Sequence, residues 1–93
     1  MLDFTDFFSK IGYEKYEMEY AAHGKYTCYK APDGCFYKID HFSNCYVIEC
    51  AENEEEARKC IFFDTDLFDD KLSKEELESK FHNWFTTYAN GDE

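Results

Sequence analysis

Proline, glycine and long apolar runs are all scarce in this sequence. The 93 residues include one proline and four glycines, and they contain no internal repeat or flexible linker. No stretch approaches the roughly 20 apolar residues that span a bilayer. The segment from Met1 to Asp6 lacks the basic and apolar regions of a secretory signal. We therefore expect one domain that associates with no membrane and works in the cytoplasm.

Basic residues are also few. Ten Lys and Arg stand against 21 Asp and Glu, which gives a formal net charge of −11. The imbalance is concentrated in residues 49–93, which hold fourteen carboxylates and five bases. Such a surface repels nucleic acid and anionic membranes and attracts a strongly basic protein. We therefore expect a basic protein partner and no direct contact with nucleic acid.

Catalytic and phosphate-binding motifs are missing. The sequence holds no G-x-S-x-G, no Gly-rich phosphate loop and no H-E-x-x-H, so we expect a protein that is not an enzyme. A Cys–His nucleophile pair is the alternative that stays open. Asp64, Asp66 and Glu75 match three ligand positions of an EF-hand loop. Phe68 and Asp69 replace another ligand and the turn-forming glycine, so a solvated acidic loop is expected instead.

Aromatic residues, by contrast, are abundant, with ten Phe, eight Tyr and one Trp. Disordered acidic segments are poor in aromatics, and each buried ring removes a large apolar area from water. The sequence therefore predicts a single folded domain over residues 1–90, followed by a disordered tail over 91–93.

The first half of the chain predicts one helix and four strands. A short apolar stretch from Leu2 to Ile11 is typical of a helix. Strict alternation of polar and apolar residues then begins at Lys15. Pro32-Asp33-Gly34 is typical of a hairpin turn, because glycine adopts the positive φ that such turns need. The predicted strands are 15–20, 25–31, 35–40 and 45–50, which together form an antiparallel meander.

Helical periodicity replaces alternation after Ala51. Asn53 suits the N-cap of a short helix with an acidic first turn, and residues 64–71 have the composition of an acidic connector. Ser73 and Glu76 form a capping box for a longer helix. The predicted fold is therefore α+β: an N-terminal helix, a four-stranded antiparallel meander, and two C-terminal helices packed on one sheet face. The apolar stripe of the last helix, expected in the core, comprises Leu77, Phe81, Trp84, Phe85 and Tyr88.

Four of the five cysteines are predicted to meet if the hairpin turns contain two or four residues. Strand alternation then places Cys28, Cys35 and Cys50 on one sheet face, and Cys60 approaches from the following helix. That arrangement predicts a tetrahedral Zn²⁺ site, with His41 as the reserve ligand. A three-residue turn between the second and third strands instead places Cys28 on the opposite face. The alternative is that these thiols are unliganded core residues, because the chain has no C-x-x-C motif.

Carboxylates of the second half are the predicted partner-binding residues. Most of them have no base four residues further on with which a helical ion pair forms. The alternative is that they only solubilise the fold. The set is Glu52, Glu54, Glu55, Glu56, Asp64, Asp66, Asp69 and Asp70.

Residues 46–55, YVIECAENEE, are predicted to be a strand that runs into an acidic helix. This segment resembles the strand-to-helix passage of the small anti-CRISPR proteins with which phages inhibit type II Cas9, and the small acidic α+β plan is similar. The resemblance implies an inhibitor that blocks DNA binding or loading by Cas9 in the bacterial host cell. Bacterial immunity proteins, which block a toxin nuclease with an acidic face, are similar in the same features. A small zinc-binding interaction module is a third alternative, and the oligomeric state is left open.

Overall fold

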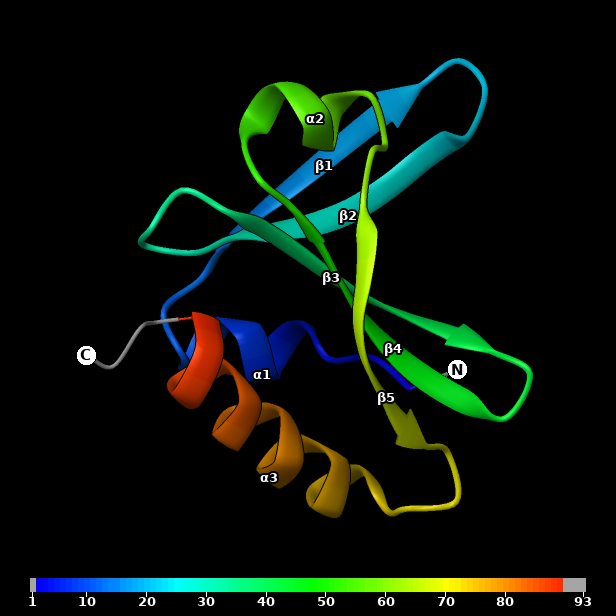
Figure 1. Ribbon diagram of the computed structural model, residues 1–93, viewed down its shortest axis with the longest axis vertical. Coiled ribbons are helices and arrows are strands. Elements are labelled where there is room, and N and C mark those ends of the chain that lie inside the picture. The colour runs from blue at the N-terminus through cyan, green and yellow to red at the C-terminus, as the bar shows by residue number, and fades with distance from the viewer. Residues whose placement is uncertain (1, 90–93) are drawn as a thin grey trace.

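The structure is a computed structural model that describes residues 2–89 (Figure 1). It is α+β, with one five-stranded antiparallel sheet whose strands follow sequence order. The predicted tail, 91–93, lies outside the described residues. The helices are α1 (Thr5–Lys10), α2 (Glu54–Arg58) and α3 (Lys74–Trp84), and a π-helical turn (Phe85–Ala89) follows α3. The strands are β1 (Glu14–Tyr20), β2 (Gly24–Lys30), β3 (Phe36–Phe42), β4 (Cys45–Ala51) and β5 (Phe63–Asp69).

Side-chain caps fix the starts of α2 and α3, as the sequence predicts. The Asn53 side-chain oxygen accepts a hydrogen bond from the Glu56 backbone N–H (2.9 Å). The Ser73 hydroxyl oxygen accepts one from the Glu76 N–H (3.1 Å), while the Glu76 carboxylate accepts one from the Ser73 N–H (3.0 Å). These bonds satisfy backbone donors that have no partner within the first turn of a helix.

The predicted count of four strands is wrong, because the residues expected to form an acidic connector include β5. This strand pairs antiparallel with β4 along its whole length, with a bulge between Ile48 and Glu49. The Thr65 hydroxyl donates a hydrogen bond to the Ile48 carbonyl (2.6 Å) beside the bulge. Nearly every residue of β5 is exposed. The strand therefore lacks the polar–apolar alternation by which a half-buried strand is recognised.

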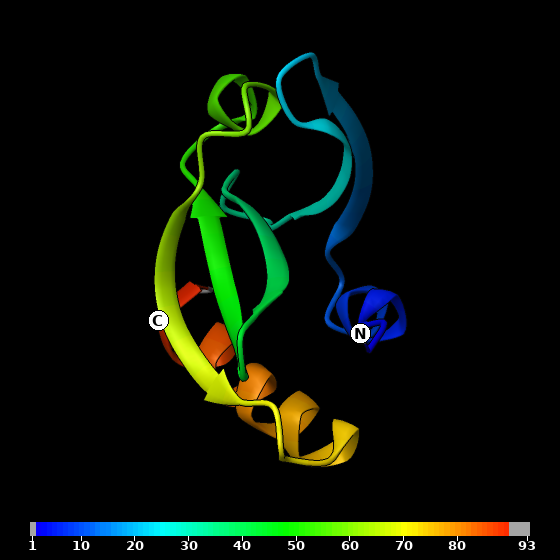
Figure 2. The ribbon, with the colours of Figure 1, turned by 90° about the vertical axis from the view of Figure 1, so that its right-hand side faces the viewer.

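The two C-terminal helices cover opposite faces of the sheet, which contradicts the prediction that they share one face. α2 lies on the face called here the α2 face, where Ala57 packs with Met18, Cys28, Phe36 and Ala51. The small side chains of Ala51 and Ala57 let this helix lie close over the end of β4. α1 and α3 lie on the other face, called here the aromatic face. Figures 1 and 2 show α2 at one end of the sheet and α1 with α3 at the other.

The aromatic face carries most of the core. Phe8 stacks on Tyr29 with ring centroids 4.1 Å apart, and Phe81 makes edge-to-face contacts with Phe4 and Phe68, each at 5.0 Å. Burial of so many rings supplies the apolar area that a short chain needs. Of the predicted stripe on the last helix, Leu77, Phe81 and Phe85 are buried, whereas Trp84 is partly exposed and Tyr88 is 68% exposed.

The sheet opens between β2 and β3. These strands pair at two positions, Tyr29↔Tyr37 and Lys30↔Phe36, and the β1–β2 hairpin then diverges from β3, β4 and β5 (Figure 2). The turn between β2 and β3 has three residues, 32–34, and Gly34 adopts a φ of +95° there. The odd number of residues in this turn sets which side chains of β2 and β3 share a face.

Candidate functional site

β5 is an end strand of the sheet, and its outer backbone side has no partner strand among residues 2–89. Asp64, Asp66 and Asp69 are exposed along it. No Lys, Arg or His within the described residues forms an ion pair with any of these three carboxylates. The edge therefore presents negative charge without its own counter-ions on a backbone held by β4. Asp64 lies opposite Glu49 and Asp66 opposite Ile48, so the bulge places these two carboxylates on opposite faces of the sheet.

The carboxylates of α2 are less free. Glu54 pairs with Arg58 (2.6 Å) and Glu55 with Lys59 (3.3 Å). These two carboxylates are exceptions to the expected lack of bases four residues further on. Exposed pairs of this kind contribute about 0.3–0.5 kcal/mol to the stability of a helix. Their main effect here is to neutralise the charge of Glu54 and Glu55. The other two predicted carboxylates of this region, Glu52 and Glu56, are exposed and partly buried respectively.

Asp70 has a structural role. Its carboxylate contacts His41 Nε2 (2.8 Å), and its backbone N–H donates to the Asn44 carbonyl (3.1 Å). Asp69 accepts a hydrogen bond from the Lys71 N–H (2.9 Å) while staying exposed. Asp64 and Asp66 are therefore the predicted carboxylates best placed to meet a partner without loss of a tertiary contact.

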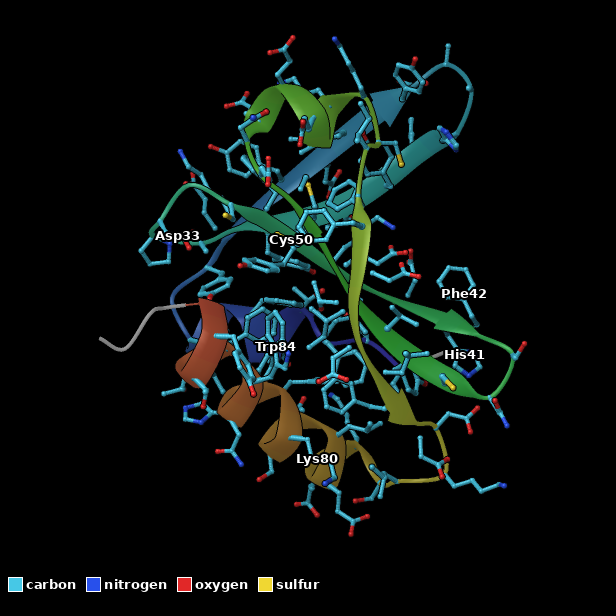
Figure 3. All side chains as sticks on the ribbon, in the orientation of Figure 1. Asp33, His41, Phe42, Cys50, Lys80 and Trp84 are labelled. Carbon is cyan, nitrogen blue, oxygen red and sulfur yellow. The ribbon has the colours of Figure 1, made fainter. Side chains whose placement is uncertain are left out.

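An apolar groove runs between β5 and α3. It has a volume of about 560 Å³, and its apolar lining includes Phe68, Leu72, Trp84 and Tyr88, with Lys80 among its polar residues. Leu67 borders the same groove, but it lies opposite Val47, so its side chain, 62% exposed, is on the other face of β5. Figure 3 shows Trp84 and Lys80 on α3, beside the lower part of β5. The groove thus adds an exposed apolar surface to the acidic edge.

A second, smaller hollow of about 260 Å³ lies on the β4 side of the same edge. It is lined by Asn44 and Cys45 together with Leu67, Phe68 and Asp69 of β5. The end of β5 is therefore flanked by a hollow toward β4 and by the groove toward α3.

The structure separates the four cysteines predicted to bind zinc. The three-residue turn places Cys28 on the α2 face, whereas Cys35 and Cys50 pack on the aromatic face. Cys60 lies near Cys28, and all five cysteines are free thiols. No group of three or more His, Cys, Asp or Glu within residues 2–89 is placed to hold a metal ion. The reserve ligand, His41, contacts Asp70 instead.

Burial disfavours the thiolate forms that zinc requires. It raises the pKa of the Cys28 thiol to about 11 and that of Cys50 to about 12. Burial also raises the pKa of Cys35 and of Cys60. Cys28 lies on the opposite face of the sheet from Cys35 and Cys50, so the structure does not bring the four thiols to a single site.

A buried charge cluster on the α2 face was not predicted from the sequence. The Lys38 ammonium donates hydrogen bonds to both Asp40 and Glu49, and it lies 4.9 Å from the centroid of the Phe62 ring. Burial and the hydrogen bond with Asp40 raise the pKa of Glu49 to about 7. Burial opposes ionisation of Asp40, but hydrogen bonds with Glu49 and Lys38 hold its pKa below the usual value. The turn between β3 and β4 has two residues, 43–44, and this length places Lys38 directly opposite Glu49. A four-residue turn, the other length considered from the sequence, would not place them opposite each other.

The opening between β2 and β3 also holds a cavity, of about 310 Å³. Its lining includes Phe8, Thr27 and Tyr29 as well as Lys38 and Asp40. Lys38 is already paired with two carboxylates, and the lining also includes Asp3 and Lys15, so this cavity carries charges of both signs.

A search for membrane-spanning helices and three comparisons with known proteins complete the description of the chain. No helix within residues 2–89 is long and apolar enough to cross a membrane. No protein-family model, curated protein or solved structure matches the chain. The assignment of a function therefore rests on its sequence and its own surface.

Proposed function

We propose that this protein is a non-enzymatic inhibitor that binds a basic surface of a nucleic-acid enzyme through the acidic edge of β5. The first candidate target is a CRISPR effector nuclease such as Cas9, in the cytoplasm of a bacterial host. The observation that carries the proposal is the set of exposed carboxylates Asp64, Asp66 and Asp69, which have no ion-pair partner among the described residues. Asp69, at the end of this edge, borders an apolar groove.

The physical basis is competition with nucleic acid. A nuclease binds DNA or RNA in a channel of Lys and Arg, where phosphate contacts supply much of the affinity. Carboxylates held on a paired strand meet such a channel with little loss of conformational entropy. The net charge of −11 then accelerates encounter with a basic surface, and salt weakens that effect.

An immunity protein that neutralises a toxin nuclease is the second candidate, because it would use the same acidic edge on another basic channel. A zinc-binding interaction module has less support, since the cysteines lie on opposite faces. If the carboxylates only solubilise the fold, their neutralisation leaves binding to any partner unchanged.

Co-purification and inhibition assays against a panel of Cas9 proteins and toxin nucleases test the proposal. We expect tight binding to one member and loss of its nuclease activity. The variant D64N/D66N should weaken inhibition, whereas E17Q/E19Q, which removes two carboxylates from the other edge strand, β1, should not. Failure to bind or inhibit any member of either class would reject this function.

A further inference from the structure

The outer edge of β5 combines an open strand backbone, an apolar groove and unneutralised acidic side chains. We propose that this edge accepts an extended basic segment of the partner as a sixth strand, with alternate apolar side chains seated in the groove. The proposal rests on the proposed function only in taking the partner to be a protein with a basic surface. It names the part of that partner that is recognised, which is a strand alternating Lys or Arg with aliphatic residues.

The backbone is the first argument. β5 pairs with β4 on one side, and no described strand pairs with its other side. An end strand presents N–H and C=O groups that an extended peptide satisfies by strand addition. On β5 the Leu67 N–H already donates to the Asp66 carboxylate (2.9 Å), so an incoming carbonyl has to displace that local bond. Because the ladder with β4 already orders β5, most of the ordering cost falls on the incoming segment.

The groove is the second argument. In an added strand, every second side chain points to the same face. On the aromatic face such side chains would meet Leu72, Trp84 and Tyr88. On the opposite face they would lie beside Leu67, which is 62% exposed. Apolar side chains of the incoming strand would cover these surfaces, which a lone edge strand leaves in water.

Charge complementarity selects the occupant. A second copy of this chain would bring the same carboxylates, Asp64, Asp66 and Asp69, against themselves, and the chain as a whole carries −11. Like charges directly opposed across strands are destabilising, whereas opposite charges contribute about 0.2–1 kcal/mol per pair. Acidic side chains on an edge thus block self-association and leave the edge open to a basic strand. The other edge strand, β1, carries Lys15, which pairs with Glu17 (3.5 Å).

The test uses the full chain and a synthetic peptide of about ten residues that alternates Lys with Val or Leu and contains no Pro. The peptide is titrated at low salt into ¹⁵N-labelled protein. We expect saturable binding, with chemical-shift changes in residues 63–69 and at Leu72, Trp84 and Tyr88. Amide hydrogen exchange in β5 should slow in the complex, because new inter-strand hydrogen bonds protect the outward N–H groups.

A matched peptide separates strand addition from charge attraction alone. N-methylation of alternate residues preserves every side chain and charge but removes the backbone donors, so this peptide should bind about tenfold or more weakly. D64N/D66N should weaken binding of the parent peptide, and E17Q/E19Q should leave it unchanged.

Three results would overturn the proposal: equal affinity of the two peptides, shift changes centred on β1 or α2, or no saturable binding of the parent peptide. Neither peptide experiment requires a nuclease. Binding at β5 without inhibition of any nuclease would keep the strand-addition site and reject the proposed target. Inhibition of a nuclease with no strand pairing would keep the proposed function and reject the strand-addition site.

Discussion

Glu49 lies directly across the β3–β4 ladder from Lys38, and their ion pair is almost wholly removed from water. The two side chains are 10% and 13% exposed. Asp40 shares the same ammonium group, so one positive charge faces two carboxylates. A buried cluster with excess negative charge favours the protonated form of one member, and the raised pKa of Glu49 identifies that member.

Stability should fall as pH rises through the range in which Glu49 ionises in the folded state. The pKa of Glu49 is about 7 in the fold against a usual value of 4.5, so between these pH values the native state binds more protons than the unfolded state. The free energy of unfolding therefore decreases with rising pH, by about 1–3 kcal/mol in total. The lowered pKa of Asp40 acts in a separate window, because its contribution is lost only as pH falls below the usual 3.8. Urea unfolding at intervals from pH 5 to 8 measures the slope, with these limits chosen to bracket the shift.

The control for this pH dependence is E49Q, which keeps a hydrogen-bonding side chain but cannot ionise. It should flatten the slope between pH 5 and 7.5 relative to the parent. An identical slope in the two proteins would show that Glu49 is not the titrating group.

Removal of Lys38 should be destabilising. Lys38→Met leaves Asp40 and Glu49 facing each other without a counter-ion, and the loss should be about 1–3 kcal/mol, because Asp40 is 35% exposed and keeps part of its hydration. Because Glu49 is protonated in acid, the loss should be smaller at pH 5 than at pH 8. The triple variant K38M/D40N/E49Q should recover most of the stability. Denaturant titration of the three proteins measures these differences, and an equal loss for the single and triple variants would contradict them.

The last helix offers a graded series of truncations. Phe81→Ala should cost about 3–5 kcal/mol, because the ring is fully buried against Phe4, Phe7 and Phe68. Trp84→Ala should cost less, since part of that ring faces the groove. Tyr88→Ala should lie within about 0.5 kcal/mol of the parent. Thermal and urea unfolding give the order, and a larger loss at Tyr88 than at Phe81 would mean that α3 and the π-helical turn after it present another face to the sheet.

Four of the five thiols should behave as two separated pairs, Cys28 with Cys60 and Cys35 with Cys50. In the native protein at pH 8, Cys28 and Cys50 should resist a thiol reagent, because burial raises the pKa of both. Partly exposed Cys45 and Cys60 should react sooner. Elemental analysis should find well below one zinc per chain. A full equivalent of zinc, with a melting temperature that falls on chelation, would show that the cysteines come together in a way this structure does not contain.

Removal of a carboxylate's charge should slow association with the nuclease partner more when that carboxylate has no ion-pair partner in this protein. D64N/D66N should reduce the association rate and its salt dependence while leaving the melting temperature nearly unchanged. E54Q/E55Q should have a smaller effect, because Arg58 and Lys59 already pair with those side chains. Stopped-flow or surface-binding kinetics at several salt concentrations measure the rates. Equal rates for both variants and the parent would exclude an acidic-edge mechanism.

Local signals in the sequence predicted much of the fold because their causes are local. The alternation of Tyr16 and Met18, the N-cap Asn53 and the capping box of Ser73 and Glu76 each depend on neighbours within a few residues. The buried positions Leu77, Phe81 and Phe85 followed from helical spacing in the same way. The exposed carboxylates were also predictable, since their number and density depend on composition alone.

The remaining features depend on choices that span the chain. β5 forms because β4 offers it a free edge, although its own acidic sequence contains little apolar alternation. One residue more or less in the turn at 32–34 decides whether the Cys28 side chain lies on the same face of the sheet as Cys35 and Cys50 or on the opposite face. The turn at 43–44 likewise decides that Lys38 meets Glu49.

The sequence by itself determined that this is a small acidic α+β domain with an aromatic core and no recognisable catalytic motif. Those properties follow from composition and short-range periodicity. Tertiary structure alone decided which carboxylates stay free, which cysteines share a face and where an apolar groove borders the acidic edge. The physical reason is that strand register and the side on which a helix crosses a sheet are set by packing between distant segments, which no local pattern encodes.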